Sequence, residues 1–304
     1  MTNDCLVTQY VGSVSDNSLL KHRELRIFVN NAGSASNFQI TANSNGGLKA
    51  TPIVEAWSDN TTTTKTCNAN GYIQNNGKTG AVISIDNKYN LKSIGQVAAT
   101  SRINLIGDLE QLRYCTDLEV LQNLKNGDIP EQYQVTGNLS SLEGLTKLKV
   151  FIMNKALGTI SGTIDSLINC VDLETIDCNF GGHLSTLTNM SKLKSVRLVA
   201  GGVSGNLNQI GGINTLENLN VSASPSIIGD IASLNGHAAH KLNTLHIYGA
   251  GNTGIYGTLE SLVAGVTGRT DTLTVKCNAI VTLNGVAVGD QVVKTYNFAT
   301  STWS

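Results

Sequence analysis

The sequence has little charge and few aromatic residues. Only 14% of its 304 residues are charged and 5% are aromatic, and 21 Lys and Arg residues against 22 Asp and Glu residues leave a net charge of −1. A chain without a basic field cannot hold a polyanion, which argues against nucleic acid as a partner. The low charge does not predict disorder, because 40% of the residues are hydrophobic and disorder requires low hydrophobicity with high net charge.

Targeting and membrane-spanning segments are also missing. The first residues contain no basic stretch followed by an apolar run of about 7–15 residues, so the sequence predicts no secretory signal peptide. No run of about 18 apolar residues occurs, so it predicts no membrane span either. We therefore expect a chain that is made and folds in the cytosol.

Zinc-binding Cys-x-x-Cys pairs are absent from the cysteine pattern. The six cysteines are Cys5, Cys67, Cys115, Cys170, Cys178 and Cys277. Three disulfides are one possibility for an even number, but we expect free and mostly buried thiols. We expect no metal and no cofactor.

A repeat is the main feature that the sequence does contain. From about residue 107 it repeats Gly-x-Leu/Ile-x-x-Leu/Ile, a short spacer, and Leu-x-x-Leu-x-Leu. The opening glycines are Gly107, Gly137, Gly162, Gly182, Gly205, Gly229 and Gly257. The closing phrase begins at Leu148, Leu173, Leu193, Leu216 and Leu242, with a weaker copy at Leu273. Such a period is typical of stacked repeat architectures.

The phrase resembles the leucine-rich repeat, Leu-x-x-Leu-x-Leu-x-x-Asn/Cys, over residues 105–280. Alternating apolar residues have the period of a strand with one buried face, and a single repeat cannot bury that face without stacked neighbours. The three-residue spacing of Leu139, Leu142 and Leu145 predicts a short helix or 3₁₀ turn on the convex side. Because the repeat length varies, we predict an α+β repeat fold: an irregular leucine-rich-repeat solenoid with a parallel sheet.

Alternation also predicts which side chains lie on the open face of that sheet. One predicted row is Ile152, Asp177, Arg197, Asn220, His246 and Thr274. The next row is Asn154, Asn179, Val199, Ser222, Tyr248 and Lys276, and the preceding row is Val150, Thr175, Ser195, Asn218 and Thr244. From these rows we predict a recognition surface made by Asn154, Asp177, Asn179, Arg197, Asn220, His246, Tyr248 and Lys276. The alternative is a face that is only solvated.

The two ends do not repeat. Apolar runs at residues 25–29, 38–40 and 81–85, separated by Asn-Gly and similar turn sequences, predict a small all-β domain over residues 1–105. Asn284-Gly285 predicts a hairpin turn, and a further strand follows at residues 294–298. We therefore predict three parts: a β-rich attachment and oligomerisation domain (1–105), the solenoid (106–279) and a C-terminal β-hairpin cap (280–304).

Each catalytic candidate is weak, and we expect no enzyme. His237 and His240 are three apart, but a catalytic zinc needs a third ligand and usually a Glu beside one His. We expect a polar loop at this position. The sequence around Ser204 approaches Gly-x-Ser-x-Gly with the wrong spacing, and no phosphate-binding loop, EF-hand or carboxylate pair stands out.

Two interaction roles remain. In the first, the chain is a bacteriophage head or tail fibre or decoration protein, located in the virion. Short stretches at residues 6–8, 16–20 and 24–27 resemble the N-terminal ends of proteins from phages of gut Bacteroidetes. This resemblance implies that the N-terminal region contacts other virion proteins while the repeat face binds a host-surface protein or glycan. We expect a homo-oligomer, a dimer or trimer, because avidity raises weak affinities.

The second role is a bacterial cell-surface adhesin whose repeats bind host matrix or glycans. A cytosolic repeat-type binding protein is a third possibility. Repeat folds of this kind do not by themselves define a function.

Overall fold

Two compact units make up the chain in the computed structural model: Met1–Leu145 with Ala156–Ser161, and Thr146–Lys155 with Gly162–Ser304. The structure describes residues 25–30, 37–42, 52–56, 62–66, 72–74, 81–85, 91–95, 102–105, 107–123, 135–153, 158–249, 254–278 and 280–304.

Between residues 25 and 105 the described segments of the first unit are all β-strands. They are β1 (Leu25–Asn30), β2 (Asn37–Ala42), β3 (Pro52–Ala56), β4 (Thr62–Thr66), β5 (Tyr72–Gln74), β6 (Ala81–Ile85), β7 (Leu91–Gly95) and β8 (Arg102–Leu105). Strands β4, β3, β6, β1 and β8 lie in that order in an antiparallel sheet, and β7, β2 and β5 are also paired antiparallel. The strands predicted at 25–29, 38–40 and 81–85 are therefore confirmed as β1, β2 and β6.

The first unit also contains the first repeats. Strand β10 (Val120–Asn123) pairs parallel with β7, and β9 (Gly107–Asp108), β11 (Val135–Asn138) and β13 (Gly158–Ser161) form a second parallel sheet. The 3₁₀ helices η3 (Leu109–Leu112) and η5 (Leu139–Leu142) follow β9 and β11. The leucines at both ends of each 3₁₀ helix are fully buried, so the three-residue spacing serves the core.

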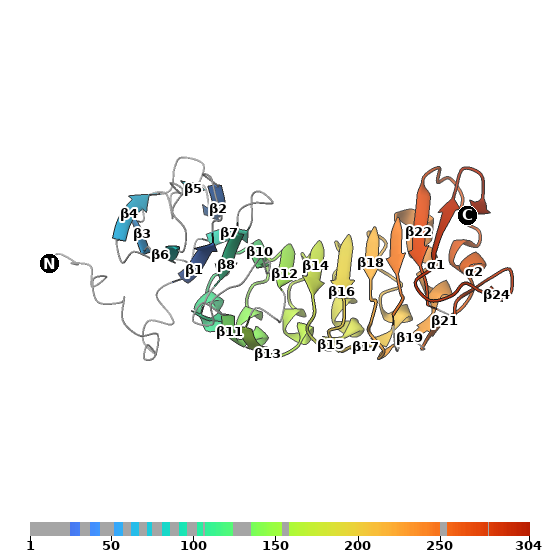
Figure 1. The fold of residues 1–304 in the computed structure, drawn as a ribbon, viewed down its shortest axis with the longest axis horizontal. Helices are drawn as coiled ribbons and strands as arrows, with labels where there is room; N and C mark the ends of the chain where they lie inside the picture. Colours follow the sequence, from blue (N-terminus) through green and yellow to red (C-terminus); the bar gives the residue numbers. More distant parts are fainter. Residues whose placement is uncertain are drawn as a thin grey trace. The chain divides into compact units, whose positions relative to one another are not determined.

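In the second unit the closing phrases form one continuous sheet. Its parallel strands, in chain order, are β12 (Val150–Met153), β14 (Thr175–Cys178), β16 (Ser195–Leu198), β18 (Asn218–Asn220), β20 (Thr244–His246) and β22 (Thr272–Lys276). Figure 1 shows them side by side. Alternate residues, such as Ile176 and Cys178 on β14, are buried, and those between them are partly exposed. This alternation on parallel strands confirms the predicted leucine-rich-repeat solenoid.

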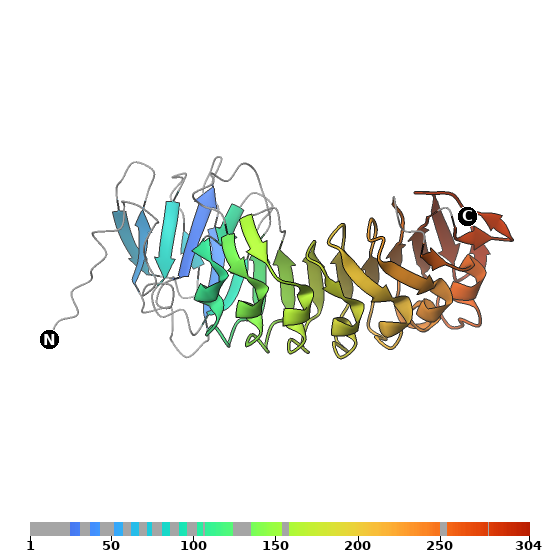
Figure 2. The same ribbon diagram turned by 90° about the horizontal axis from the view of Figure 1, so that it is seen from below.

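A second set of strands lies across the core from the first. It comprises β15 (Gly182–His183), β17 (Val203–Asn206), β19 (Ile227–Asp230) and β21 (Ile255–Tyr256), paired parallel in that order. A short helix follows each one, as Figure 2 shows: η8 (Leu184–Leu187), η9 (Leu207–Gln209), η10 (Ile231–Leu234) and α2 (Leu259–Val263). The repeat before them has η7 (Ile164–Leu167). The sequence predicted the 3₁₀ turns but not this second sheet.

At several repeat openings, of which Gly229 is one, both conformation and space require glycine. Gly229 has φ 121°, and a Cβ atom there would lie 2.5 Å from Oδ1 of Asn206 in the preceding repeat. Asn206 is the N-cap of η9, and its Oδ1 accepts a hydrogen bond of 3.0 Å from the amide of Asn208. A helix cap in one repeat therefore fills the space that a side chain in the next repeat would need.

Antiparallel strands close the C-terminal end. Strand β25 (Val293–Asn297) pairs with β22, and β26 (Thr302–Trp303) pairs with β25. The predicted hairpin is confirmed as β23 (Thr282–Leu283) and β24 (Val286–Ala287), joined through Asn284 and Gly285 at φ 53° and 74°. The domain boundaries at 105/106 and 279/280 remain predictions.

Arg269 joins this closing segment to the last repeats. Its side chain is 7% exposed, donates to the carbonyl oxygen of Leu242 at 3.0 Å and to Oδ1 of Asn243 at 2.8 Å, and pairs with Asp271. The guanidinium carbon lies 4.1 Å from the ring centroid of Phe298. One buried cation therefore holds the preceding repeat and the segment after β25 together.

The cysteines in the described residues are buried. Cys178 and Cys277 are free thiols, and burial raises the pKa of each to about 12. Cys115 and Cys170 are likewise fully buried. The expectation of buried thiols is confirmed for these four, while Cys5 and Cys67 lie outside the described residues.

Candidate functional site

Two adjacent rows of side chains occupy the open face of the main sheet in the second unit. The first row, called here the paired row, consists of Asp177, Arg197, Asn220, His246 and Lys276. The second, called the open row, consists of Thr175, Ser195, Asn218, Thr244, Thr274 and Thr295. Within each row, successive members lie directly opposite each other on neighbouring strands.

Members of the paired row bond mainly to one another and to the adjacent turn. Arg197 Nη1 lies 2.7 Å from Asp177 Oδ1 in an ion pair between β16 and β14. Asn220 Oδ1 accepts hydrogen bonds from the amide of Ser222 at 3.1 Å and from its hydroxyl at 2.6 Å. Asn220 Nδ2 lies 3.4 Å from His246 Nδ1, which links β18 to β20.

The last members of the paired row surround one aromatic ring. Lys276 Nζ lies 4.0 Å from the ring centroid of Tyr248, and the His246 ring packs edge-on against the same ring at 5.9 Å. Burial lowers the pKa of His246, and the charge of Lys276 lowers it further. His246 is therefore a neutral imidazole near pH 7, and Lys276 covers the face of Tyr248.

The structure corrects part of the predicted surface. Lys276 stands opposite His246 and Thr274 opposite Thr244, so each lies one row away from its predicted place. Ser222, expected on the open face, is 3% exposed because it turns in to bond Asn220. Asn179 is only partly exposed. Asn154 lies outside the described residues.

The open row differs from the paired row in its hydrogen bonds. All six side chains are partly or fully exposed, and none makes a side-chain hydrogen bond to any part of the chain that the structure describes. Five of these residues were predicted on the open face, Thr274 one row away from its actual place, but none was among the predicted recognition residues. Only the contacts show that their hydroxyl and amide groups remain available for a ligand.

Alternating charges flank the open row on its other side. Backbone hydrogen bonds place Lys149, Glu174, Lys194 and Glu217 next to one another along the stack. Lys194 Nζ lies 2.6 Å from Glu174 Oε2, and a hydrogen bond from Lys194 lowers the pKa of that carboxyl. Because two positive and two negative residues alternate, this flank has no net charge.

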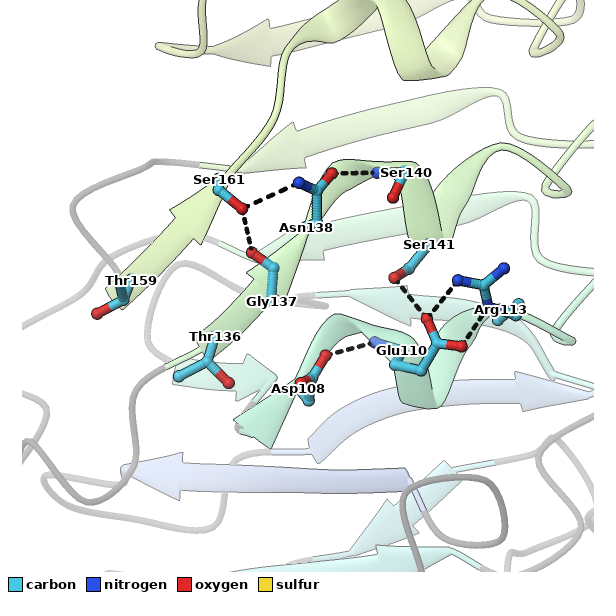
Figure 3. A pocket seen from close by; sticks show the side chains of 10 residues that line it. All are labelled: Asp108, Glu110, Arg113, Thr136, Gly137, Asn138, Ser140, Ser141, Thr159 and Ser161. Carbon is cyan, nitrogen blue, oxygen red and sulfur yellow. Dashed lines mark hydrogen bonds and ion pairs between the residues drawn. The ribbon is translucent and has the colours of Figure 1, made fainter. Parts of the chain in front are cut away.

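A separate hollow of about 660 Å³ lies on the first unit (Figure 3). Its lining is Asp108, Glu110, Arg113, Thr136, Gly137, Asn138, Ser140, Ser141, Thr159 and Ser161. Glu110 pairs with Arg113 and accepts a hydrogen bond of 2.9 Å from Ser141, and Asn138 Nδ2 donates to Ser161 Oγ at 3.0 Å. Arg113 neutralises Glu110, and Oδ1 of Asp108 accepts a hydrogen bond of 2.9 Å from the amide of Glu110. Most of the remaining lining consists of hydroxyl residues, including Thr136 and Thr159.

The catalytic candidates do not assemble into a reactive group. His237 is fully buried in α1 (Asn235–His240), so the polar loop expected there was wrong. Ser204 lies on β17, where its hydroxyl donates to the carbonyl oxygen of Gly182 at 3.3 Å. In the described ranges, no three His, Cys, Asp or Glu side chains gather where they could hold a metal ion. No helix in those ranges is both long and apolar enough to span a membrane.

Neither a protein-family model nor a curated protein sequence matches the chain. Similar solved structures include the plant peptide hormone receptor RGFR1 in complex with RGF2, at 18% identity and a TM-score of 0.38 over 56% of this chain and 28% of the receptor. An internalin from Listeria monocytogenes matches at 22% identity and a TM-score of 0.37, over 57% of this chain and 50% of the internalin.

The leucine-rich-repeat ectodomain of the Arabidopsis receptor kinase HAESA, in complex with a peptide hormone ligand, matches at 18% identity and a TM-score of 0.40. That match covers 62% of this chain and 29% of the receptor. The chain thus spans half or less of the length of these three structures. At these identities the likeness concerns the fold alone.

Proposed function

We propose that the chain is a non-enzymatic binding scaffold that contacts a macromolecular partner through the open face of the main sheet. The observation that supports this is the continuous exposure of polar side chains on five consecutive parallel strands, from β14 to β22. Such a surface is rigid, because the opposite side of every strand is core. A rigid surface loses little conformational entropy when it binds.

Site-specific photo-cross-linking tests this proposal. A photoreactive residue at Ser195, on the open face, is compared with one at Asn208, which is exposed on η9 beside the second sheet. The probe is a panel of intact gut Bacteroidetes cells. We expect cross-links from position 195 and few from position 208. Equal cross-linking from both positions, or none from either, would contradict binding by this face.

The predicted recognition residues give a second test. Replacing Arg197, His246 and Tyr248 together by Ala should leave the thermal unfolding profile nearly unchanged, because these side chains lie on the face and not in the core. Binding to the same cells should weaken. Unchanged cell binding would remove these three residues from the recognition surface and favour a face that is only solvated there.

The setting we propose is the virion of a bacteriophage, with residues 1–105 attached to other virion proteins and residues 106–279 displayed as a head or tail fibre or decoration protein. A bacterial surface adhesin is the alternative, and a cytosolic binding protein is the third. Capsid, portal or tail genes beside the gene would support the first setting, and a signal peptide in the complete gene product would support the second. A monomeric mass in light scattering would contradict the predicted dimer or trimer.

A further inference from the structure

We infer that the open row is a binding track for an uncharged, polyhydroxylated chain, that is, a neutral glycan strand lying along the stack. The inference rests on the proposed function, since it names the ligand class of the same face. It selects residues different from the predicted recognition surface, which is dominated by the paired row.

The first argument is the regular spacing of the track. Thr175, Ser195, Asn218, Thr244, Thr274 and Thr295 stand opposite one another on six adjacent strands. Neighbouring strands are about 4.8 Å apart, so the row offers one hydrogen-bonding side chain at each step of about 4.8 Å. A ligand that matches this row must itself carry polar groups at a regular and similar interval.

The second argument is the contrast between the two rows. In the paired row, Arg197 bonds Asp177, and Asn220 bonds Ser222. In the open row, no side chain bonds to the described protein. Hydroxyl groups both donate and accept hydrogen bonds, and the amide of Asn218 does the same through two atoms. The row can therefore match a ligand whose own groups are also hydroxyls.

The third argument concerns charge. On one side of the open row lie Lys149, Glu174, Lys194 and Glu217, which alternate in sign. On the other side, Asp177 and Arg197 neutralise each other, and only Lys276 adds charge at one end. A polyanion or polycation would meet repulsion at every second step of the flank, whereas a neutral chain would not.

An extended peptide fits the track less well than a glycan. A peptide in the extended conformation advances about 3.3 Å per residue, whereas the side chains of the open row are about 4.8 Å apart, so the polar groups of the two do not stay in register. Protein-binding surfaces usually depend on aromatic and Arg anchors, but Tyr248 is covered by Lys276 and Arg197 is paired with Asp177. One sugar unit of a glycan chain is about as long as the spacing between neighbouring strands. Successive sugar units can therefore each meet one side chain of the open row.

Titration of the full chain with neutral hexasaccharides of glucose, mannose and N-acetylglucosamine tests the inference. At least one should bind, with affinity that falls as the oligosaccharide is shortened. Thr244→Val with Thr274→Val removes two hydroxyls while keeping the side-chain shape, and should weaken binding about fivefold per hydroxyl, about 25-fold together. Thr267→Val, at an exposed hydroxyl away from the sheet, is the matched control and should change nothing.

The alternatives give different results. If no hexasaccharide binds while position 195 still cross-links to a cell-surface protein, the glycan inference is overturned and the proposed function stands. Binding of a Ser/Thr-rich peptide or of poly-glutamate, without binding of the sugars, would also overturn the glycan inference and leave the proposed function standing. Hexasaccharide binding that is unaffected by the double valine variant, but lost on replacing Arg197 or Lys276, moves the site to the paired row. The absence of any binding, with no cross-link from position 195, overturns both proposals.

Discussion

Replacing Gly229 by Ala tests the packing that repeats through the stack. The new Cβ would lie 2.5 Å from Oδ1 and 3.0 Å from Cγ of Asn206, and the backbone φ of 121° is one that side chains rarely adopt. The conformational cost is about 1–3 kcal/mol, and overpacking adds about 1–3 kcal/mol. We therefore expect a loss of about 3 kcal/mol in the free energy of unfolding.

Urea denaturation followed by circular dichroism measures this loss, and Gly212→Ala is the control. A Cβ at Gly212 would meet nothing within 4 Å, and its backbone is outside the glycine-requiring region. We expect a change within about 0.5 kcal/mol for the control. A loss below about 1 kcal/mol at position 229, or an equal loss at position 212, would refute the argument from space and conformation.

A double-mutant cycle separates the two costs. Asn206→Ala alone removes the cap of η9 and should cost about 1 kcal/mol. Because it also removes the atom that the new Cβ would strike, the variant with both changes should lose less than the sum of the single losses. Strict additivity would show that the contact between Asn206 and position 229 does not contribute, leaving the backbone conformation as the whole effect.

Three further changes test the core, the closing segment and one carboxylate. Leu219→Ala removes a fully buried side chain and should cost about 2–5 kcal/mol in urea denaturation, and a negligible loss would mean that the strand register is wrong. Arg269→Met removes a guanidinium that is 7% exposed and should cost about 3 kcal/mol, with hydrogen exchange rising first in β25. Burial raises the pKa of Asp165, but hydrogen bonds from Thr186 and His183 outweigh it, so the folded pKa lies below the unfolded one. Its stabilising contribution is therefore present above the unfolded pKa and is lost as pH falls through the folded pKa, and Asp165→Asn should flatten this acid limb of the stability curve.

The sequence predicts those parts of the fold that depend on local pattern. Ile176 and Cys178 alternate with polar neighbours, so their strand is recognisable from a few residues. The same holds for the turn at Asn284 and Gly285, where both residues adopt positive φ in a two-residue hairpin. In each case the residues that determine the structure are adjacent in the chain.

The parts that the sequence misses depend on neighbours from other repeats. Strand β15 has two residues, Gly182 and His183, too few to show alternation, and it exists because β17 pairs with it. The register of Lys276 depends on how β22 aligns with β20, and the weaker copy of the phrase at Leu273 does not define that alignment. His237 carries a polar side chain but is buried between repeats.

The choice of recognition residues also depends on neighbouring repeats, which the sequence does not show. Charged and aromatic residues such as Arg197 and Tyr248 stand out in the sequence, and that is why the prediction selected them. Such groups are also the ones that satisfy one another once the strands align, as Arg197 does with Asp177 and Lys276 with Tyr248. Small hydroxyl residues such as Thr244 are inconspicuous in the sequence, and their side chains make no hydrogen bond to the residues that the structure describes. Whether a polar group is available for a ligand depends on its partners across strands.

In a solenoid, the polar groups that are available for a ligand are also regularly spaced. Each repeat contacts only its neighbours, so a position on the sheet recurs along the stack with the spacing of the strands. Where that position holds opposite charges in alternation, as at Glu174 and Lys194, the recurrence cancels the field. Where it holds hydroxyls without a hydrogen bond to any described residue, as in the open row, the recurrence offers equivalent contacts in one line. The glycan strand that we propose is linear and neutral, so it would make the same kind of contact at every repeat of the open row.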